Sequence, residues 1–397
     1  MVSIKKKVAI FTGNRAEYGL QIPILEAIKE HPNLDYLLFV SGAHLDPTYG
    51  HTVKEIESDG FEIHEHIDIG KGDTSLFSTA HAISKGISEI TKCIEKHSPD
   101  IFIVYADRYE SFAAAISASQ TNTITVHIEG GDITEGGALD DSVRHAMTKL
   151  SHFHCVTNKE AFERIKAMGE EEWRIKLVGY PAIDLITNND FTPPADLQTL
   201  FHLDFNQPIL IFTQHSVTTQ FDDVVTQLMP SINAINACAH DGIRCIVTYP
   251  NNDAGGDKIY QYLDSKLSDS ENILLTKSLG RKNYWGILNL ARESLANVIC
   301  VGNSSSGIKE TATFKCPTVN IGSRQQGRLR GSNIIDVPYI EDEIISAIKK
   351  AFFDEQFRRE CRETINPYDL GGAGKLIADL VNNIEINNIT RTKKMTI

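Results

Sequence analysis

The stretch that decides the fold is IFIVYADRYESFAAAISASQTNTITVHI, residues 101–128. It contains two apolar runs, 101–106 and 123–128, on either side of a helix-forming segment at 108–120. Apolar strands that alternate with helices predict a parallel sheet with helices packed on both of its faces. The same alternation continues before and after this stretch, so the sequence predicts an α/β protein.

The alternation forms two series that are separated by a pause across 184–207, where Asn188-Asn189 and Pro193-Pro194 indicate a connection. In the first series we expect strands at 7–11, 36–41, 101–106, 123–128, around Cys155 and at 176–179, and helices at 20–30, 52–59, 78–97, 108–120, 141–150 and 159–168. In the second we expect strands at 209–212, 244–248, 273–276, 298–301, 318–321 and 334–337, and helices at 222–239, 257–268, 284–294, 307–314 and 341–353. A last helix is expected from 375 to about 383, and the final residues 390–397, TRTKKMTI, have no periodic pattern and are expected to be flexible. The predicted architecture is two doubly wound domains with a ligand in the cleft between their strand ends.

The composition limits the possible partners and the compartment. A net charge of −13 over 397 residues argues against a nucleic-acid-binding protein, because such proteins use basic side chains to neutralise phosphates. No apolar run approaches the length of a signal peptide core or a membrane helix. The seven cysteines include no CxxC pair and no zinc-ligand spacing, so we expect reduced thiols in a cytoplasmic protein.

Ionisable side chains gather after the strand at 123–128. Glu129 ends that strand and precedes Gly130-Gly131, at the edge of a parallel sheet where α/β proteins bind their ligands. A helix beginning near Asp140 carries further charged side chains in its first turns, namely Asp140, Asp141, Arg144 and His145. The pairs Asp141/His145 and Asp140/Arg144 are four residues apart and project to one side of a helix. Asp140 also suits an ordinary helix cap, which leaves its role open.

Two other strand ends in the first half carry candidate site residues. Arg15 follows the first strand, at the usual phosphate position of such sheets, although a surface location is an equal alternative. Asp107 and Arg108 emerge from the apolar run 101–106, and Asp107 would be a second acid or base beside Glu129.

The second half contains a predicted anion site in VICVGNSSSGIKE, residues 298–310. A strand, a glycine, three serines and a helix start present N–H and hydroxyl groups to an anion, with Ser304 and Ser305 among them. Ile308 stands where a P-loop needs lysine, which disfavours an ATPase. Glu310 is placed to accept hydrogen bonds from a ribose, and Arg324 adds a basic group after the next strand.

Polar side chains also follow two other strands of the second half. His215 comes just after the strand at 209–212, and Asn251 and Asp253 follow the strand at 244–248. Each also has an ordinary interpretation as a loop or turn residue.

Taken together, GNRAEYG, ADR, HIEGGDI, LDDSVRHAMTKLSH, QHSVTT, YPNNDAG, GNSSSGIKE and GSRQQGR resemble the hydrolysing UDP-N-acetylglucosamine 2-epimerases of sialic acid biosynthesis, from about residue 7 to residue 374. The resemblance implies a GT-B-like fold with two Rossmann-like domains and the active site in the inter-domain cleft. The implied domains are 1–183, joined by a C-terminal helix within 368–397, and a nucleotide-binding domain at 184–367.

The resemblance implies that UDP-N-acetylglucosamine and water are converted to N-acetylmannosamine and UDP. Anti elimination of UDP leaves 2-acetamidoglucal, and water then adds to it. The implied roles are proton transfer and sugar contacts for Asp107, Glu129, Asp140 and Asp141, and the sugar–phosphate junction for His215 and Arg108. The resemblance further implies that the diphosphate is bound by Arg15, Ser304, Ser305 and Arg324 and that the ribose is bound by Glu310. It implies other substrate contacts from Arg144, His145, Asn251 and Asp253. No metal and no cofactor are required.

Several alternatives remain open at this stage. Related branches act on GDP-linked N-acetylglucosamine or on a UDP-linked 2,4-diacetamido-trideoxy hexose, and others are non-hydrolysing epimerases. A nucleotide-sugar-binding regulator is the non-enzyme alternative, although crowded carboxylates would be of no use to it. The resemblance also implies a homodimer or homotetramer, no nucleic-acid or membrane partner, and no sugar kinase activity.

Overall fold

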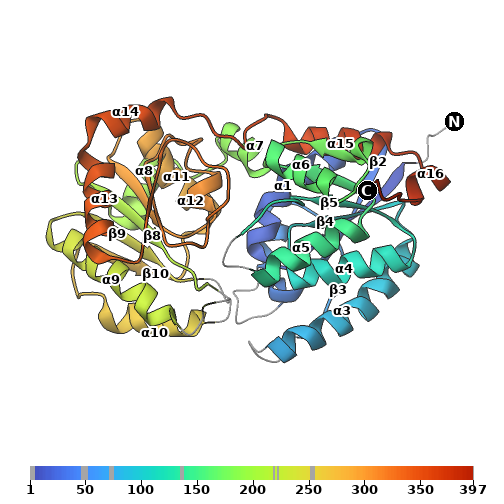
Figure 1. Ribbon diagram of the computed structural model, residues 1–397, viewed down its shortest axis with the longest axis horizontal. Helices are drawn as coiled ribbons and strands as arrows, with labels where there is room; N and C mark the ends of the chain where they lie inside the picture. Colours follow the sequence, from blue (N-terminus) through green and yellow to red (C-terminus); the bar gives the residue numbers. More distant parts are fainter. Residues whose placement is uncertain are drawn as a thin grey trace. The chain divides into compact units, whose positions relative to one another are not determined.

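The computed structural model describes residues 5–45, 52–70, 76–134, 138–217, 220, 223–250 and 255–396. The chain divides into two compact units, each built on one parallel sheet (Figure 1). Unit 1 comprises Met1–Asp132, Leu139–Asp184 and Leu370–Ile397, and unit 2 comprises Ile133–Ala138 and Leu185–Asp369. The two parallel sheets with alternating helices confirm the predicted fold class.

Unit 1 has a seven-stranded sheet of order β3-β2-β1-β4-β5-β6-β7. Its strands are β1 (Lys6–Thr12), β2 (Leu34–Ser41), β3 (Ile63–Ile67), β4 (Ile101–Tyr105), β5 (Ile124–Ile128), β6 (Phe153–Val156) and β7 (Ile175–Leu177). Its helices are α1 (Arg15–Glu30), α2 (Val53–Ser58), α3 (Leu76–His97), α4 (Tyr109–Gln120), α5 (Ala138–Leu150), α6 (Lys159–Ala167), α15 (Ala373–Asn383) and α16 (Asn388–Arg391), and α7 (Ala182–Thr187) lies where the chain passes to unit 2.

The core of unit 1 lies between its sheet and the helices that cover it. Phe11, Phe39 and Phe102 from three neighbouring strands pack with apolar residues of α3, α4 and α5. Strands β4 and β5 are buried along their whole length and β1 from Val8 to Thr12, as the apolar runs predict for a parallel sheet covered on both faces. This packing fixes the carboxyl ends of β1, β4 and β5 side by side at one edge of the sheet.

Unit 2 has a six-stranded sheet of order β10-β9-β8-β11-β12-β13. Its strands are β8 (Ile209–Thr213), β9 (Arg244–Thr248), β10 (Ile273–Thr276), β11 (Val298–Gly302), β12 (Thr318–Ile321) and β13 (Ile334–Val337). Its helices are α8 (Pro194–Phe201), α9 (Val224–His240), α10 (Gly256–Lys266), α11 (Gly280–Arg292), α12 (Ser306–Lys309), α13 (Glu341–Phe353) and α14 (Glu355–Glu363).

Several elements differ from the sequence prediction. Strand β3, IHEHI, was not predicted, because this strand at the sheet edge is only partly buried and has a weak apolar pattern. The predicted pause at 184–207 contains α8, which begins at Pro194, a position where proline suits a helix start. Helix α1 begins at Arg15 rather than at residue 20, because the Asn14 side chain caps it by accepting from the Glu17 N–H at 3.1 Å.

The C-terminal segment returns to unit 1, where α15 packs against α1 (Figure 1, red beside blue). A Cβ atom on Gly374 would lie 2.3 Å from the Pro23 carbonyl oxygen, so this close approach requires glycine. The expectation of a flexible end at 390–397 was wrong for its described residues. Residues 388–391 form α16, and Arg174 donates hydrogen bonds to the carbonyl oxygens of Ile389, Thr390 and Thr392. These contacts join residues far apart in the chain, which no local pattern reveals.

Within the described ranges, none of the helices is both long enough and apolar enough to cross a membrane.

Candidate functional site

The strand order of unit 1 places its candidate site at the carboxyl ends of β1 and β4. The chain runs outward from β1 to β3 and then restarts at β4 on the other side of β1. Open α/β sheets bind ligands where the strand order reverses in this way. Arg15 is the first residue of α1 after β1, and its side chain lies outside the described residues. Asp107 and Arg108 lie two and three residues after the end of β4, close to the strand end that the sequence predicts for them.

The buried guanidinium of Arg144, a predicted site residue, joins two others, Asp107 and Asp141. Arg144 of α5 donates hydrogen bonds to the Asp107 carboxylate, to Asp141 Oδ1 at 2.9 Å and to the Asp132 carbonyl oxygen at 2.8 Å. Its side chain is 3% exposed, against 17% for Asp107 and 20% for Asp141. A buried cation stabilises carboxylates that would otherwise repel each other, so Arg144 can hold two acids together at this edge. Arg144 therefore pairs with Asp141, which precedes it by three residues. The sequence analysis instead placed Arg144 on the same side of the helix as Asp140, which precedes it by four.

Glu129 lies at the end of β5 in a backbone conformation that is unusual for a residue with a side chain. It is buried, its φ is 64°, and its N–H donates to the Cys155 carbonyl oxygen at 2.9 Å. Ala106, just before Asp107, has a φ of 52°. Such conformations cost energy and are concentrated at functional sites. Burial and the nearby Glu129 carboxylate raise the pKa of Tyr105 well above its usual value, so that this hydroxyl keeps its proton.

His127 connects the turn before Asp107 to α5, and the sequence analysis did not identify it. Burial lowers its pKa to about 3, so the ring is neutral at physiological pH. Nε2 lies 2.8 Å from the Ala106 carbonyl oxygen, which can only accept, so Nε2 carries the proton. Nδ1 then accepts from the Thr148 hydroxyl at 3.1 Å. A polar residue inside an apolar strand was the signal available in the sequence.

Glu17 is a second buried acid that the sequence analysis missed, and it lies behind the β1 turn. It accepts from the Gly13 N–H at 2.9 Å and from the Ser111 hydroxyl at 2.7 Å. Burial outweighs these hydrogen bonds and raises its pKa to about 8. Arg108 Nε lies 3.6 Å from Oε2 of the neighbouring buried acid, Glu110.

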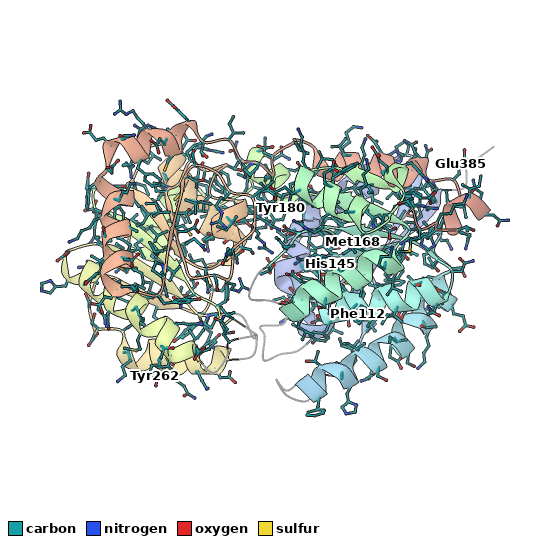
Figure 2. All side chains as sticks on the ribbon, in the orientation of Figure 1. Phe112, His145, Met168, Tyr180, Tyr262 and Glu385 are labelled. Carbon is teal, nitrogen blue, oxygen red and sulfur yellow. The ribbon has the colours of Figure 1, made fainter. Side chains whose placement is uncertain are left out.

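His145 is half-buried on α5, one residue after Arg144 (Figure 2). Burial and then the Arg144 charge lower its pKa. The ring can therefore accept a proton only against the field of its neighbour, which favours a neutral hydrogen-bonding role.

Unit 2 has its own reversal of strand order, between β8 and β11. His215 follows β8, and Ser304 and Ser305 follow β11, so the structure brings these three predicted residues to one edge of the sheet. Gly302 ends β11 with a φ of 130°, and a Cβ atom there would lie 1.9 Å from the Thr213 carbonyl oxygen. Only glycine allows the two strand ends to approach this closely.

Asn303 fixes the position of His215, and the sequence analysis did not identify this residue. Its side chain accepts from the His215 N–H at 2.7 Å and donates to the His215 carbonyl oxygen at 2.9 Å. The Asn303 backbone carbonyl oxygen accepts from Arg324 Nη1 at 3.2 Å and from Gln325 Nε2 at 2.9 Å. Asn303, which directly precedes Ser304 and Ser305, therefore links His215 and Arg324 into one hydrogen-bonded group.

The predicted helix at 307–314 is much shorter in the structure. Helix α12 covers only Ser306–Lys309, and the Thr311 hydroxyl bonds the Gly307 carbonyl oxygen at 2.7 Å, as threonine does where it competes with helix formation. A single turn has a small dipole, so the hydroxyl and N–H groups of the loop matter more for anion binding than the dipole does.

The side chains around α12 are held in place by two aromatic residues of α11. The Ser306 hydroxyl lies 3.0 Å from both the Ser304 hydroxyl and the Tyr284 hydroxyl. Glu310 is buried, and its Oε2 accepts from Trp285 Nε1 at 2.6 Å. These contacts orient the serine hydroxyls and one edge of the Glu310 carboxylate.

Two predicted site residues, Asn251 and Asp253, lie outside the described residues. Asp140 lies in the first turn of α5. Across the described ranges, no group of three or more His, Cys, Asp or Glu side chains is arranged to hold a metal ion.

Comparisons with known proteins agree on one family. Residues 26–382 match the family model described as UDP-N-acetylglucosamine 2-epimerase. The UDP-N,N'-diacetylbacillosamine 2-epimerase (hydrolyzing) of Legionella pneumophila is 33% identical over 347 residues, which are 87% of this chain and 89% of that protein. The UDP-N-acetylglucosamine 2-epimerase of Neisseria meningitidis serogroup B is 31% identical over 392 residues, 98% of each chain.

Solved structures show the same fold. A crystal structure of a UDP-GlcNAc 2-epimerase from Neisseria meningitidis bound to UDP-GlcNAc superposes with a TM-score of 0.81 at 16% identity. The superposition covers 95% of this chain and 99% of that chain, and it confirms the GT-B-like pair of α/β domains.

Proposed function

Because the chain belongs to the UDP-N-acetylglucosamine 2-epimerase family, we propose that this enzyme is of the hydrolysing type and converts UDP-N-acetylglucosamine and water into N-acetylmannosamine and UDP. The observation that carries the proposal is the buried Arg144, which gathers Asp107 and Asp141 at the edge of the sheet where Glu129 also lies. A protein that only bound the nucleotide would have no use for these acids, whose mutual repulsion costs free energy.

The first step is an anti elimination across C1 and C2 of the sugar. A carboxylate takes the C2 proton, a double bond forms between C1 and C2, and the bond from C1 to the phosphate oxygen breaks. Within unit 1 we assign proton transfer and contacts to the sugar hydroxyls to Asp107, Glu129, Asp140 and Asp141. Arg144 holds Asp107 and Asp141 in fixed positions, which a catalytic base needs before it can accept a proton.

The leaving group is a nucleoside diphosphate, whose developing charge must be stabilised. We assign this role to Arg15, Ser304, Ser305 and Arg324, and the ribose contact to Glu310. Arg108 and His215 act near the sugar–phosphate junction. The two hydrogen bonds between the Asn303 side chain and the His215 backbone support this role, because they fix the position of His215. His145, Asn251 and Asp253 complete the assigned substrate contacts. This scheme uses no metal and no cofactor.

The second step hydrates 2-acetamidoglucal. Water adds its oxygen to C1 and passes one proton to a carboxylate, while a protonated carboxyl group donates a proton to C2 on the face that gives N-acetylmannosamine. Because this proton arrives on the face opposite the one that lost the first proton, it comes from a different acid of the same set, and the group that accepted the first proton is not its source.

A second candidate substrate is UDP-N,N'-diacetylbacillosamine. The relative from Legionella pneumophila is named for hydrolysis and epimerisation of that sugar. Both candidates are UDP-linked 2-acetamido sugars and need the same C2 chemistry, so they differ only in contacts to the substituents at C4 and C6.

The test is to incubate the purified enzyme with UDP-N-acetylglucosamine, UDP-N,N'-diacetylbacillosamine and GDP-N-acetylglucosamine in parallel. We expect UDP and N-acetylmannosamine in equal amounts from the first. Product formed in D₂O must carry deuterium at C2, as seen by NMR, and its absence would rule out elimination. Return of a UDP-linked epimer in place of free sugar would assign the enzyme to the non-hydrolysing type.

Two variants test the residue assignments. Glu129→Gln and Asp107→Asn should each reduce UDP release by more than about a hundredfold, by the usual weight of general acid–base catalysis. Both should still bind UDP in calorimetry, because the proposed diphosphate contacts are unchanged. Full activity in both variants would refute the assignment. Light scattering measures the homodimer or homotetramer that we also propose.

A further inference from the structure

The C-terminal tail, residues 386–396, is fastened to unit 1 by contacts that the proposed reaction does not use. Asn387 caps α16, and its Oδ1 accepts from the Thr390 N–H at 3.0 Å. At the other end, the Thr396 N–H donates to the Gly169 carbonyl oxygen at 3.1 Å. The tail lies beyond residues 26–382, the part that matches the family model.

A buried arginine holds the backbone of the tail. Arg174 is 1% exposed and donates to the carbonyl oxygens of Thr390 at 2.9 Å, Ile389 at 3.0 Å and Thr392 at 2.7 Å. Its Nε donates to Glu171 Oε2 at 2.7 Å, which orients the guanidinium. A planar guanidinium has five fixed donors, so these contacts define the path of the tail.

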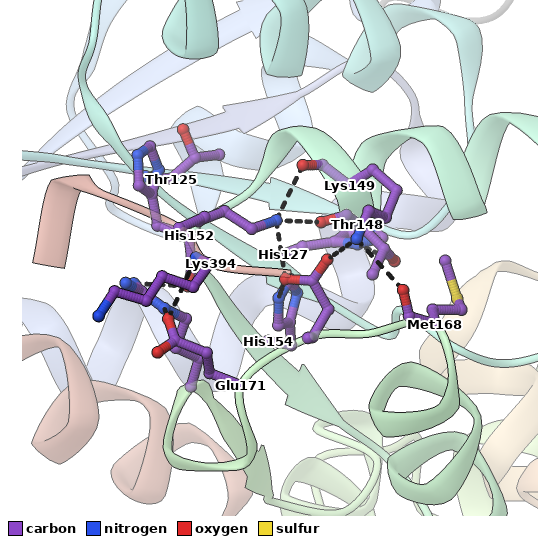
Figure 3. Close-up of polar contacts among 12 residues, drawn as sticks. Thr125, His127, Thr148, Lys149, His152, His154, Met168, Glu171 and Lys394 are labelled. Carbon is purple, nitrogen blue, oxygen red and sulfur yellow. Dashed lines mark hydrogen bonds and ion pairs between the residues drawn. The ribbon is translucent and has the colours of Figure 1, made fainter. Parts of the chain in front are cut away.

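Lys393 reaches from the tail to the end of α5. Its Nζ donates to the Lys149 carbonyl oxygen at 2.8 Å, the Thr148 carbonyl oxygen at 3.2 Å and Glu170 Oε2 at 2.8 Å (Figure 3). An ammonium group has three N–H donors, and here three acceptors surround it. Thr148 and Lys149 belong to the last turn of α5, whose carbonyl oxygens have no partner within the helix. A positive charge at this end also suits the helix dipole.

The other end of α5 carries the proposed catalytic groups. Asp140, Asp141 and Arg144 lie in its first two turns. The helix has 13 residues and is therefore about 20 Å long. Helices shift and slide as stiff elements, so a change at the Lys393 end moves the end that holds Asp141.

We propose that the tail is a clamp that sets the position of α5, and that Lys393 is a positioning residue for the Asp107–Arg144–Asp141 cluster. This inference rests on the proposed function. Its chemistry is simple, because one ammonium group bonds the last carbonyl oxygens of α5 and pairs with the buried Glu170 carboxylate in the loop that follows α6.

The first test compares two neighbouring lysines. Lys393→Met removes the ammonium and keeps the length of the side chain, whereas Lys394→Met is the matched control, because the Lys394 side chain is exposed. We expect kcat for UDP release to fall at least tenfold in Lys393→Met and to stay within twofold in Lys394→Met. A displacement of about 1 Å can cost on the order of a hundredfold in rate. Lys393→Arg should recover most of the lost activity.

Two readouts separate positioning from general stabilisation. The affinity for UDP should be unchanged in Lys393→Met, so the loss falls on kcat. Hydrogen exchange should accelerate at the amides of α5 and not at those of α4. All rates are measured well below the thermal midpoint of each variant.

A second design avoids variants that fold poorly. A protease site inserted between the exposed residues Glu385 and Ile386 allows the folded enzyme to be cut after purification. Removal of the freed tail in mild denaturant should lower kcat, and a synthetic peptide of residues 386–396 should restore it.

The outcomes are distinct. Equal kcat in Lys393→Met and Lys394→Met, or full activity after the tail has been removed, overturns the inference. If the native enzyme releases no UDP from any donor, the proposed function fails, while hydrogen exchange of α5 still reports whether the tail holds this helix.

Discussion

Replacing Glu170 by glutamine should destabilise unit 1, and the structure fixes both the size and the pH dependence of the effect. The Glu170 side chain is 1% exposed and contacts Lys149 Nζ at 2.6 Å, Lys393 Nζ at 2.8 Å and His154 Nε2 at 3.1 Å. Burial acts to raise the pKa of Glu170, but the hydrogen bonds from His154, Lys149 and Lys393 together lower it from 4.5 to about 2.

The magnitude follows from linkage between protonation and folding. A pKa that is lowered by about 2.5 units corresponds to about 3 kcal/mol of stability at neutral pH. Burial lowers the pKa of Lys393, so the desolvation of this ammonium offsets part of the gain. We therefore expect Glu170→Gln to lower the free energy of unfolding by about 1–3 kcal/mol at pH 7.

The pH dependence has a definite sign. Because the pKa is lower in the folded state, the stabilisation is present above pH 4.5 and is lost as the pH falls toward 2. The difference between the native protein and Glu170→Gln should shrink by more than half between pH 7 and about pH 3.

The assay uses the fluorescence of Trp173, one of the two tryptophans of the chain. In a Trp285→Phe background, only Trp173 remains, and its ring lies 4.1 Å from the Arg174 guanidinium in unit 1. Its fluorescence then follows urea unfolding of unit 1, where a loss of 2 kcal/mol shifts the midpoint by about 1 M. Glu172→Gln is the control, because the exposed Glu172–Lys166 pair should contribute under about 1 kcal/mol. Equal midpoints for Glu170→Gln and Glu172→Gln at pH 7, or a gap that persists at pH 3, would refute the reasoning.

Three further predictions concern the candidate site. Because the pKa of Glu17 is raised from 4.5 to about 8 in the folded state, the native protein should lose up to about 5 kcal/mol of stability as the pH rises through this range. Glu17→Gln has no such carboxyl group and should not show this loss. Urea unfolding of both proteins at pH 5 and pH 9 measures the difference. Asn303→Ala should free the backbone of His215 and reduce kcat by roughly ten- to a hundredfold, while circular dichroism shows that the protein stays folded. An unchanged kcat would show that Asn303 does not position His215 for catalysis. Glu310→Gln should weaken UDP binding by roughly tenfold in calorimetry, because the charged acceptor that Trp285 orients is lost, and equal affinity would remove Glu310 from the ribose site.

The strands of unit 2 were the easiest part to predict from sequence. The expected bounds of β9, β10, β12 and β13 agree with the structure residue for residue. Each contains a short apolar run between turn residues: β9 and β12 lie inside the sheet, where burial on both faces requires that pattern, and the edge strands β10, ILLT, and β13, IIDV, keep an apolar run although they are less buried. Strand β3, IHEHI, was missed because polar residues interrupt its apolar residues, which its partly exposed position at the sheet edge permits.

The family resemblance is confirmed, and the sequence also located the ends of the strands that carry the candidate site. Asp107 and Glu129 stand at strand ends, where the strand-end rule expects ligand contacts. The roles of Arg144 and Asn303 depend on contacts with Asp107 and His215, 37 and 88 residues away in the chain. Hydrogen bonds over such separations depend on the folded sheet, so local patterns cannot reveal them.

The placement of residues 370–397 in unit 1 affects how the chain is made. Lys6 at the start of β1 donates to the carbonyl oxygens of Val381 and Ile384, so the first strand and the end of α15 stabilise each other. On the ribosome, Leu185–Asp369 must be synthesised between them, which takes roughly 10 to 40 seconds at usual elongation rates. During that interval the sheet of unit 1 has emerged but lacks α15 and the tail. Unit 2 therefore has time to fold beside an unfinished partner, and chaperones would meet unit 1 with the surface of α1 still uncovered.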